Sequence, residues 1–398
     1  MDGPVHVPIP KTLRGLALLL SSLLFLASTA RADTPPTSTS TSDLTTLQSG
    51  TTDAYQATAG RKANYGHYFA TRYDDTPGDV AMLCSQPGVR GVLWRETWNE
   101  VEPSPGQYDF SGYERVLRAI ETSNNPKCQL WVMVEFKSFN TSPVRNPCPD
   151  YLQGRYSGPN ADGSRAMTCF MWEPTVQRAY QAMMRAAGAR FDDNPRIEGF
   201  VLQESALGFT GQYSQDVGDG GTYTAVAWRD ALIDMVQQCA SAFSNSRCMA
   251  FVNFIRNGPE FIDDVAAAIA RVPDNRACLS GPDLLPDEKA LYSHNGAIYE
   301  VLARHGGCRA NSAQNRSYGI RNFNLYDVFR FAVGGTKGDF QQREPRSSGV
   351  CVNSYLFWNH RVGESWTGLD WINALPVIAA YPYGREWLDA CEGGGGPP

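Results

Sequence analysis

Acidic side chains stand at the ends of several short apolar segments in the middle of this chain. Glu204 closes an apolar run within residues 196–207 (RIEGFVLQESAL), Glu135 closes the run WVMVEF, and Asp283 lies in the turn-like stretch 280–286. Carboxyl groups at neighbouring strand ends can act as a general acid and a general base. We therefore predict that Glu204, Asp283 and Glu135 are the catalytic candidates.

Each of these acids also has an interpretation without catalysis. Glu204 could be a solvated loop carboxylate, and Asp283 could cap a helix or form an Asx turn. Glu135 could be held in a salt bridge with Arg95 or Lys137. A fourth acid, Glu96, follows another apolar run and is a further candidate.

The elements that must position these acids alternate between β-like and helical patterns. Segments with a β-like pattern are residues 64–70, 89–95, 129–136, 197–204, 248–254, 277–281, 317–324 and 352–358. Helical patterns lie between most of them, for example at 174–189, 223–242 and 259–270. This alternation predicts a (β/α)8 TIM barrel with loop insertions, in which catalytic groups follow the strands. Residues 139–172 are expected to form a long loop on that catalytic face.

Residues 88–117, GVRGVLWRETWNEVEPSPGQYDFSGYERVL, resemble the second-strand region of polysaccharide-cleaving glycoside hydrolases of clan A. That region commonly has an Arg, then a Trp and an EP-x-PG-x-Y-x-F segment. The matching residues here are Arg95, Trp98, Glu102, Pro103, Pro105, Gly106, Tyr108 and Phe110. The resemblance implies a (β/α)8 barrel with the acid/base, Glu204, after the fourth strand. Gln203 precedes it where the family usually has Asn.

The same resemblance implies a nucleophile, usually Glu, at the end of the seventh strand. The segment expected there, 317–324, contains no carboxylate, and Asp327 lies three residues beyond it. The second catalytic acid must therefore come from another strand end, or the chain does not hydrolyse glycans. Both alternatives stay open at this point.

Polar and aromatic side chains near the expected strand ends suit a sugar, whose CH faces stack on rings and whose hydroxyls need hydrogen-bond partners. The resemblance also implies that Trp358 floors the sugar site, although a core aromatic is the alternative. The substrate-binding residues predicted in this way are Arg95, Trp98, Gln203, Asn253, Asn322, Trp358 and His360. No CxxC pair or dinucleotide-binding motif is present, so we expect neither a metal site nor a cofactor.

The N-terminal residues 1–32 have the pattern of a secretory signal, with Lys11 and Arg14 before an apolar stretch and Ala30-Arg31-Ala32 as a cleavage site. Residues 33–59 form a Ser/Thr/Pro-rich leader, 60–391 the predicted barrel domain, and 392–398 a flexible tail. We expect a secreted or periplasmic protein with no integral membrane segment after signal cleavage.

Ten cysteines in an exported chain indicate disulfides. Plausible pairs, whose connectivity the sequence does not fix, are Cys84–Cys128, Cys148–Cys169, Cys239–Cys248, Cys278–Cys308 and Cys351–Cys391.

The formal charge is −6, and it becomes −8 without the signal segment 1–32, which carries three basic residues and one acidic residue. An acidic chain without a basic run is a poor nucleic-acid binder. A carbohydrate is therefore the predicted partner. A glycoside hydrolase is the leading interpretation, and the alternatives are a glycan-binding barrel without catalysis and a lyase acting on a uronate-containing glycan.

Overall fold

The computed structural model describes residues 62–138, 146–157, 167–207, 223–255, 257–284, 301, 305, 307–313, 325–333, 352–360, 371–383 and 387. All of these belong to one compact unit, Thr46–Pro398. Asn322, residues 317–324 and the pair Cys351–Cys391 lie outside the described residues.

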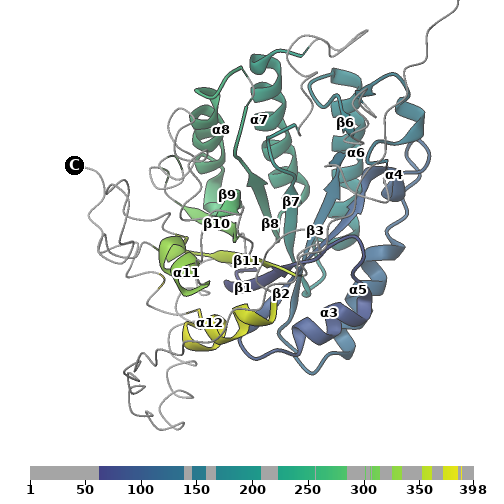
Figure 1. Cartoon of the computed structure of the whole chain (residues 1–398). Coiled ribbons are helices and arrows are strands. Elements are labelled where there is room, and N and C mark those ends of the chain that lie inside the picture. The colour runs from purple at the N-terminus through teal and green to yellow at the C-terminus, as the bar shows by residue number, and fades with distance from the viewer. Residues whose placement is uncertain are drawn as a thin grey trace, which may run out of the picture. The chain divides into compact units, whose positions relative to one another are not determined.

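Eight parallel strands close into a barrel, so the predicted (β/α)8 fold is confirmed (Figure 1). In barrel order the strands are β1 (Gly66–Ala70), β2 (Val89–Thr97), β3 (Gln129–Glu135), β7 (Ile197–Leu202), β8 (Arg247–Phe251), β9 (Ala277–Leu284), β10 (Cys308–Ala313) and β11 (Tyr355–Asn359). Pairing of β11 with β1 closes the ring, with Tyr355 opposite Gly66.

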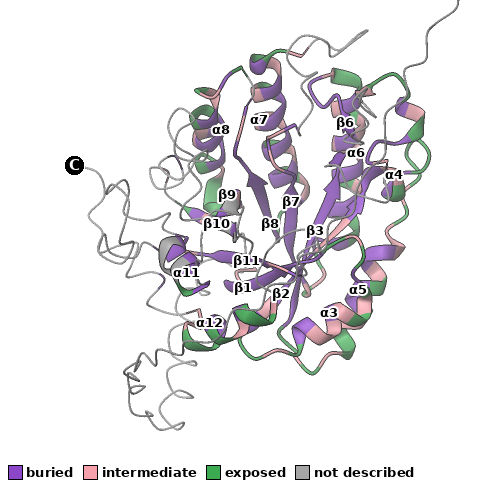
Figure 2. Cartoon of the chain, viewed as in Figure 1, coloured by how far each residue is buried: buried purple, intermediate pink, exposed green. Residues whose placement is uncertain are grey.

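Helices surround the barrel and bury the face that they turn toward the strands (Figure 2). They are α3 (Pro77–Cys84), α4 (Trp98–Val101), α5 (Ser111–Thr122), α6 (Pro174–Phe191), α7 (Ala225–Ala242), α8 (Phe261–Ala270), α11 (Leu325–Val333) and α12 (Leu375–Ala380). Short 3-10 helices are η1 (Asp150–Leu152), η3 (Pro273–Asn275) and η4 (Trp371–Ala374). The predicted helices at 174–189, 223–242 and 259–270 correspond to α6, α7 and α8.

The seventh barrel strand was placed wrongly by the sequence. It is β10, with the sequence CRANSA, and not the segment 317–324. This strand has no aromatic or β-branched residue, so its composition gives no β signal. Its conformation comes instead from pairing with β9 on one side and β11 on the other. The relocated strand is likewise followed by no Asp or Glu before Asp327.

The middle of the barrel is filled by inward-facing apolar side chains. This inner cluster includes Tyr68, Leu93, Trp131, Met133, Val201, Met249, Phe251, Tyr355 and Phe357. Toward the N-terminal ends of the strands, Gly91 and Gly199 leave room for the rings. A Cβ on Gly91 would lie 2.6 Å from the Tyr68 ring, and one on Gly199 would lie 2.4 Å from the Trp131 ring.

The connection between β3 and α6 contains a small antiparallel sheet on the C-terminal side of the barrel. Its strands are β4 (Lys137–Ser138), β5 (Tyr156–Ser157) and β6 (Met167–Cys169), in the order β4-β6-β5. The predicted long loop 139–172 is therefore partly ordered into strands. A disulfide between Cys148 and Cys169 ties its two halves together.

Four of the five predicted disulfide pairs fall on described residues, and all four are formed. Their Cα–Cα separations are 5.7 Å for Cys84–Cys128, 5.5 Å for Cys148–Cys169, 6.0 Å for Cys239–Cys248 and 4.6 Å for Cys278–Cys308. Of these four, Cys148–Cys169 is the one that lies beyond the C-terminal ends of the strands.

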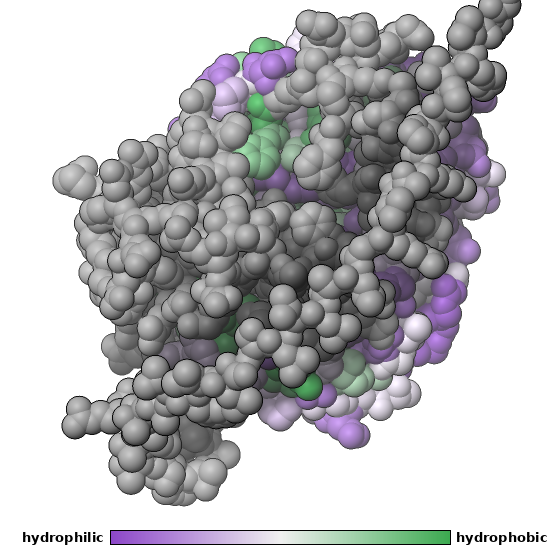
Figure 3. Space-filling model, in the orientation of Figure 1, coloured by the Kyte–Doolittle hydropathy of each residue, from purple (hydrophilic) through white to green (hydrophobic). Residues whose placement is uncertain are grey.

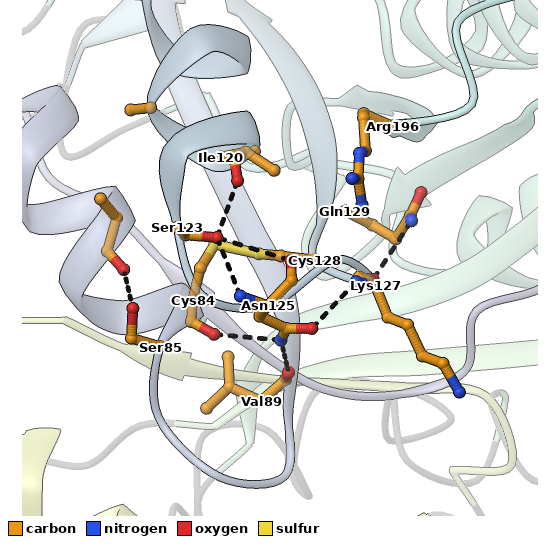
Figure 4. The surroundings of a disulfide bond; sticks show 12 residues. Cys84, Ser85, Val89, Ile120, Ser123, Asn125, Lys127, Cys128, Gln129 and Arg196 are labelled. Atoms are coloured by element: carbon orange, nitrogen blue, oxygen red, sulfur yellow. Dashed lines mark hydrogen bonds between the residues drawn. A yellow bond between two sulfur atoms is a disulfide. The ribbon is translucent and has the colours of Figure 1, made fainter.

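Beside the disulfide Cys84–Cys128, the turn between α5 and β3 is hydrogen-bonded to the end of α3 and the start of β2 (Figure 4). The Asn125 amide donates to the carbonyl oxygens of Cys84 at 3.0 Å and Val89 at 3.1 Å. Its Oδ1 accepts from the backbone N–H of Lys127 at 2.9 Å. This turn stabilises the end of the barrel opposite to the candidate site.

Figure 3 shows mostly hydrophilic residues along the right-hand margin of the described surface. Large hydrophobic side chains are exposed, among the described residues, at Val226, Tyr326 and Ile372. Within the part of the chain that the structure describes, no helix is long and apolar enough to cross a membrane.

Candidate active site

In four adjacent strands, the side chains that face the barrel interior change from apolar to polar at the C-terminal end. Successive inward positions lie two residues apart in a strand. Leu93, Met133, Val201 and Phe251 belong to the inner apolar cluster, and the next inward positions are Arg95, Glu135, Gln203 and Asn253. Polar groups from β2, β3, β7 and β8 thus gather at the end of the barrel where (β/α)8 enzymes carry their catalytic groups.

Glu204 follows β7 at this end, as predicted, and its side chain is 13% exposed. Its Oε2 accepts a hydrogen bond from Asn253 Nδ2 at 2.6 Å. Its Oε1 lies 3.7 Å from Lys137 Nζ. The carboxylate is therefore held in one orientation while part of it stays open, which is what a general acid/base requires.

Asn253 orients Glu204 through one amide group. Its Nδ2 donates to Glu204, while its Oδ1 accepts from the backbone N–H groups of Ala206 and Phe254, both at 2.8 Å. Ser205 Oγ also donates to this oxygen at 3.2 Å. The side chain is 1% exposed. Asn253 was predicted to bind substrate, and the structure instead engages its amide with the segment that carries Glu204.

Gln203 was also predicted to bind substrate, and that prediction is wrong. Its Oε1 accepts from the backbone N–H groups of Phe136 at 3.1 Å and Lys137 at 3.0 Å. Its Nε2 donates to the Lys137 carbonyl at 2.9 Å and reaches Glu135 Oε1 at 3.5 Å. Both amide atoms are occupied by protein groups, so Gln203 joins the ends of β3 and β7.

Lys137 also belongs to the site, although from the sequence it was predicted only as a possible partner for Glu135. Its side chain is 0% exposed, and its ammonium donates to the backbone carbonyls of Glu204, at 2.5 Å, and Ala206. The available signal was a lysine three residues after the wholly apolar run 130–134. Burial of a lysine at such a position requires partners for its charge.

Glu135 is 1% exposed and lies 3.6 Å from Arg95 Nη1, measured from its Oε1. The salt-bridge interpretation of Glu135 thus agrees with the structure, with Arg95 as the partner. The Arg95 side chain is 27% exposed. The buried acid therefore anchors an arginine whose guanidinium reaches the open end of the barrel.

The strand-end acid Glu96 points away from the barrel interior. Its Oε1 accepts from Trp94 Nε1 at 3.3 Å. The carboxylate packs against α5, since a Cβ on Gly112 would lie 1.4 Å from Glu96 Oε1. Glu96 is thereby excluded as a catalytic acid. Asp283 lies in β9, and its side chain is outside the described part of the chain.

Trp358 is a core aromatic, so the prediction that it floors a sugar site is wrong. It is 0% exposed and belongs to the outer hydrophobic cluster between strands and helices. Its Nε1 donates to His67 Nδ1 at 3.0 Å. The alternation along β11 explains the error, because Phe357 faces the barrel interior and its neighbour must face outward.

His360 is buried beside the end of β11. Its Nδ1 lies 2.8 Å from Asp75 Oδ2, and its ring packs against Trp371 at a centroid distance of 5.5 Å. This placement closes the imidazole off from an incoming sugar, contrary to its predicted binding role.

The segment that carried the resemblance builds the connection from β2 to α5. Trp98 is 0% exposed, so it is not the predicted sugar-binding ring. Its Nε1 donates to Glu102 Oε2 at 2.7 Å, and Glu102 Oε1 accepts from Gly106 N at 2.8 Å. Gly106 has φ +70°, a left-handed conformation that favours glycine. These residues fix the turn between β2 and α5.

Among the described residues, no group of three or more His, Cys, Asp or Glu side chains is arranged to hold a metal ion.

Comparison with known proteins gives matches of structure alone, since no family model and no curated protein matches the sequence. GH5_18 from Streptomyces cattleya, in complex with GlcNAc, superposes with a TM-score of 0.52 at 11% identity over 82% of this chain and 81% of that chain. Endo-glycoceramidase II from Rhodococcus sp. gives a TM-score of 0.49 at 14% identity, over 79% and 78%. A β-galactosidase from the haloarchaeon Halorubrum lacusprofundi gives 0.49 at 11% identity, over 82% and 57%.

The superposition with GH5_18 shows that the barrel has the fold that the resemblance implied. At such identities the likeness concerns the fold, and a (β/α)8 barrel supports many chemistries. The function must therefore be argued from the site.

Proposed function

We propose that the protein is a glycoside hydrolase that cleaves an O-glycosidic bond in an oligosaccharide or polysaccharide, with Glu204 as the general acid/base. The observation that carries this proposal is the geometry of Glu204. Its partly exposed carboxylate follows the fourth barrel strand and is fixed by Asn253 and Lys137. In (β/α)8 enzymes the C-terminal end of the strands is where substrates react.

For the second carboxylate we favour Asp283 over Glu135. Glu135 is 1% exposed and paired with Arg95, so a sugar carbon has no path to it. Asp283 lies in β9, which is separated from β7 in the barrel by β8 alone. Carboxyl groups roughly 5–5.5 Å apart act with retention of configuration, and those about 6.5–9.5 Å apart act with inversion.

Of the predicted substrate-binding residues, Arg95 is the one that the described structure supports best. It is inward-facing, partly exposed and anchored by Glu135, so its guanidinium is positioned to donate to sugar hydroxyls. Asn322 keeps the same assignment as a proposal from sequence alone.

We also infer that the protein is exported. The signal-like pattern of residues 1–32 supports this inference, as do the four disulfides within the barrel unit. Disulfides persist in oxidising compartments and are rare in the cytosol.

A glycan-binding barrel without catalysis is the second candidate. It is favoured by one observation, the absence of any Asp or Glu from Cys308 to Tyr326, where the seventh strand and its following loop lie in sequence.

Incubation of the purified protein with a panel of glycans in ¹⁸O-labelled water, followed by mass spectrometry, tests the proposal. A hydrolase adds one labelled water to each cleaved bond. A lyase produces an unsaturated end without label, and a binding protein leaves the glycan intact while retaining it in a pull-down. Either of the last two results, obtained with a glycan that the protein binds, would contradict the proposal.

A further inference from the structure

The ends of β3 and β7 hold each other through two side chains that cross in opposite directions. The Gln203 amide makes three hydrogen bonds to the backbone of residues 136–137. The Lys137 ammonium in turn binds the backbone carbonyls of Glu204 and Ala206. Gln203, after β7, therefore fixes the backbone at Lys137, and Lys137, after β3, fixes the backbone of residues 204–206.

We propose that this reciprocal clasp, formed by Lys137 and Gln203, is the positioning device for the Glu204 carboxylate. The proposal rests on the catalytic role of Glu204 proposed above and adds residues to which no role in the reaction has been assigned. Lys137 contributes in two ways, because its ammonium fixes the backbone around Glu204 and also lies 3.7 Å from Glu204 Oε1.

The burial of the clasp supports a positioning role. Lys137 is 0% exposed and Gln203 is 5% exposed, so neither presents its polar atoms to a sugar. Burying an ammonium group is costly unless hydrogen bonds and opposite charge compensate it. The compensation here is made by the backbone and side chain of the segment 204–206, and it ties that segment to one geometry.

The small sheet in the β3–α6 connection also holds the backbone of Lys137 in place. Lys137 is the first residue of β4, and it pairs with Thr168 of β6. The next residue of β6, Cys169, is bonded to Cys148 and donates its backbone N–H to the Phe136 carbonyl at 2.9 Å. The disulfide thereby limits movement of the backbone that carries Lys137.

Zero-length cross-linking tests the contact without relying on activity. A carbodiimide activates a carboxylate, an adjacent lysine amine displaces the resulting urea, and an amide forms with net loss of one water. In the wild-type protein we expect peptide mapping to show an amide between Lys137 and Glu204. It should be absent in Lys137→Arg and Glu204→Gln, and its absence from the wild-type protein would overturn the clasp.

Shortening Gln203 tests whether the clasp is reciprocal. Gln203→Asn withdraws the amide from the backbone of residues 136–137 by one methylene, and we expect the yield of the cross-link to fall several-fold. Gln177→Asn makes the same change on α6, where the side chain bonds to the Ala231 carbonyl at 3.5 Å, and should leave the yield unchanged. An unchanged yield in Gln203→Asn would refute a role for Gln203.

Kinetics on a confirmed glycan test the positioning role itself. Lys137→Met keeps the length of the side chain and removes the ammonium, and we expect kcat to fall by about 10²-fold with a much smaller change in KM. A folded Lys137→Met protein with wild-type kcat would overturn the positioning role and leave the proposed hydrolase intact. Absence of hydrolysis by the wild-type protein would instead reject the proposed function, while the cross-link still reports on the clasp.

Discussion

Asn253 shows how one buried side chain controls the candidate acid. Its Oδ1 accepts from the backbone around Glu204, and its Nδ2 is the donor to the Glu204 carboxylate. Asn253→Asp keeps the acceptor, removes that donor and places a second carboxylate beside Glu204. We expect a folded protein whose kcat/KM is lowered by at least about 10²-fold, in the range typical of lost acid–base catalysis.

The matched control for that substitution is Asn194→Asp. Asn194 Oδ1 also accepts from a backbone N–H, that of Arg196 at 2.8 Å, but it lies before β7 at the opposite end of the barrel. Steady-state kinetics on both variants check the prediction. Equal activity of Asn253→Asp and Asn194→Asp would show that Glu204 does not depend on its amide partner.

The two remaining candidate acids should respond differently to neutralisation. If Asp283 is the second catalytic carboxylate, Asp283→Asn lowers kcat by about 10²–10⁴-fold. Glu135→Gln removes the charge that anchors Arg95 and should act mainly on KM. Measurement of kcat and KM for both variants separates these roles, and a large fall in kcat for Glu135→Gln alone would reverse the assignment.

At the scale of elements, α5 depends on Gly112 for its approach to β2. A Cβ at this position would overlap the buried Glu96 carboxylate, because Glu96 Oε1 lies 1.4 Å from the place that the Cβ would occupy. We expect Gly112→Ala to lower the free energy of unfolding by about 1–3 kcal/mol, as overpacking commonly does.

Gly78→Ala is the control, because Gly78 is likewise the second residue of its helix, α3. A Cβ there meets nothing closer than Thr76 Oγ1 at 3.4 Å, so the usual stabilisation of a helix by alanine should apply. Urea denaturation of both variants gives the two free energies. A Gly112→Ala protein as stable as Gly78→Ala would disprove the packing of Glu96 against α5.

The strands and helices that could be predicted from the sequence are those whose apolar residues follow the period of a strand or a helix. The strand ending before Gln203 and the helix α6 have clear apolar patterns, so Glu204 could be placed at a strand end. β10 carries none of these signals, because Cys308–Ala313 takes its conformation from β9 and β11. The conformation of β10 is therefore determined by pairing with strands elsewhere in the chain and not by its own composition.

The position of Glu204 after a barrel strand was predictable from the sequence, and the side chains that hold it were not. Glu204 follows a recognisable strand, whereas the role of Lys137 depends on a contact with residues 67 and 69 positions further along the chain. The role of Trp358 was predicted from its position at a strand end, without regard to which side of the strand it faces. Because Phe357 faces the barrel interior, Trp358 faces the hydrophobic layer between the strands and the helices.

At the scale of the whole molecule, closure of the barrel places a neutral histidine in the outer core. His67 of β1 accepts from Trp358 Nε1 at Nδ1, and its Nε2 lies 2.8 Å from the Tyr381 carbonyl. Burial is the main cause that lowers the pKa of His67 to about 4. The hydrogen bond to the Tyr381 carbonyl opposes this shift in pKa, and the charge of Arg90 adds a smaller lowering. The folded protein therefore keeps this imidazole neutral at pH values where an unfolded chain protonates it.

This difference predicts a loss of stability in mild acid. Well above pH 6.5 both states are neutral at His67 and its contribution is complete. Between about pH 6.5 and 4 the unfolded state binds a proton that the folded state does not, which lowers the free energy of unfolding by about 3 kcal/mol. Urea midpoints across this range, compared with those of His67→Gln, should show a shallower pH dependence in the variant, and identical slopes would contradict the assignment.

The replacement of Glu204 by Gln is the most direct test of the catalytic assignment. Glu204→Gln preserves shape and removes the titratable proton, and Glu121→Gln on the exposed surface of α5 is the control. With a glycan that the wild-type protein hydrolyses, the account predicts a folded Glu204→Gln protein whose turnover falls by about 10²–10⁴-fold, while Glu121→Gln matches the wild type. Near-normal turnover by Glu204→Gln would show that the barrel shares the fold of glycoside hydrolases but that Glu204 is not its acid/base.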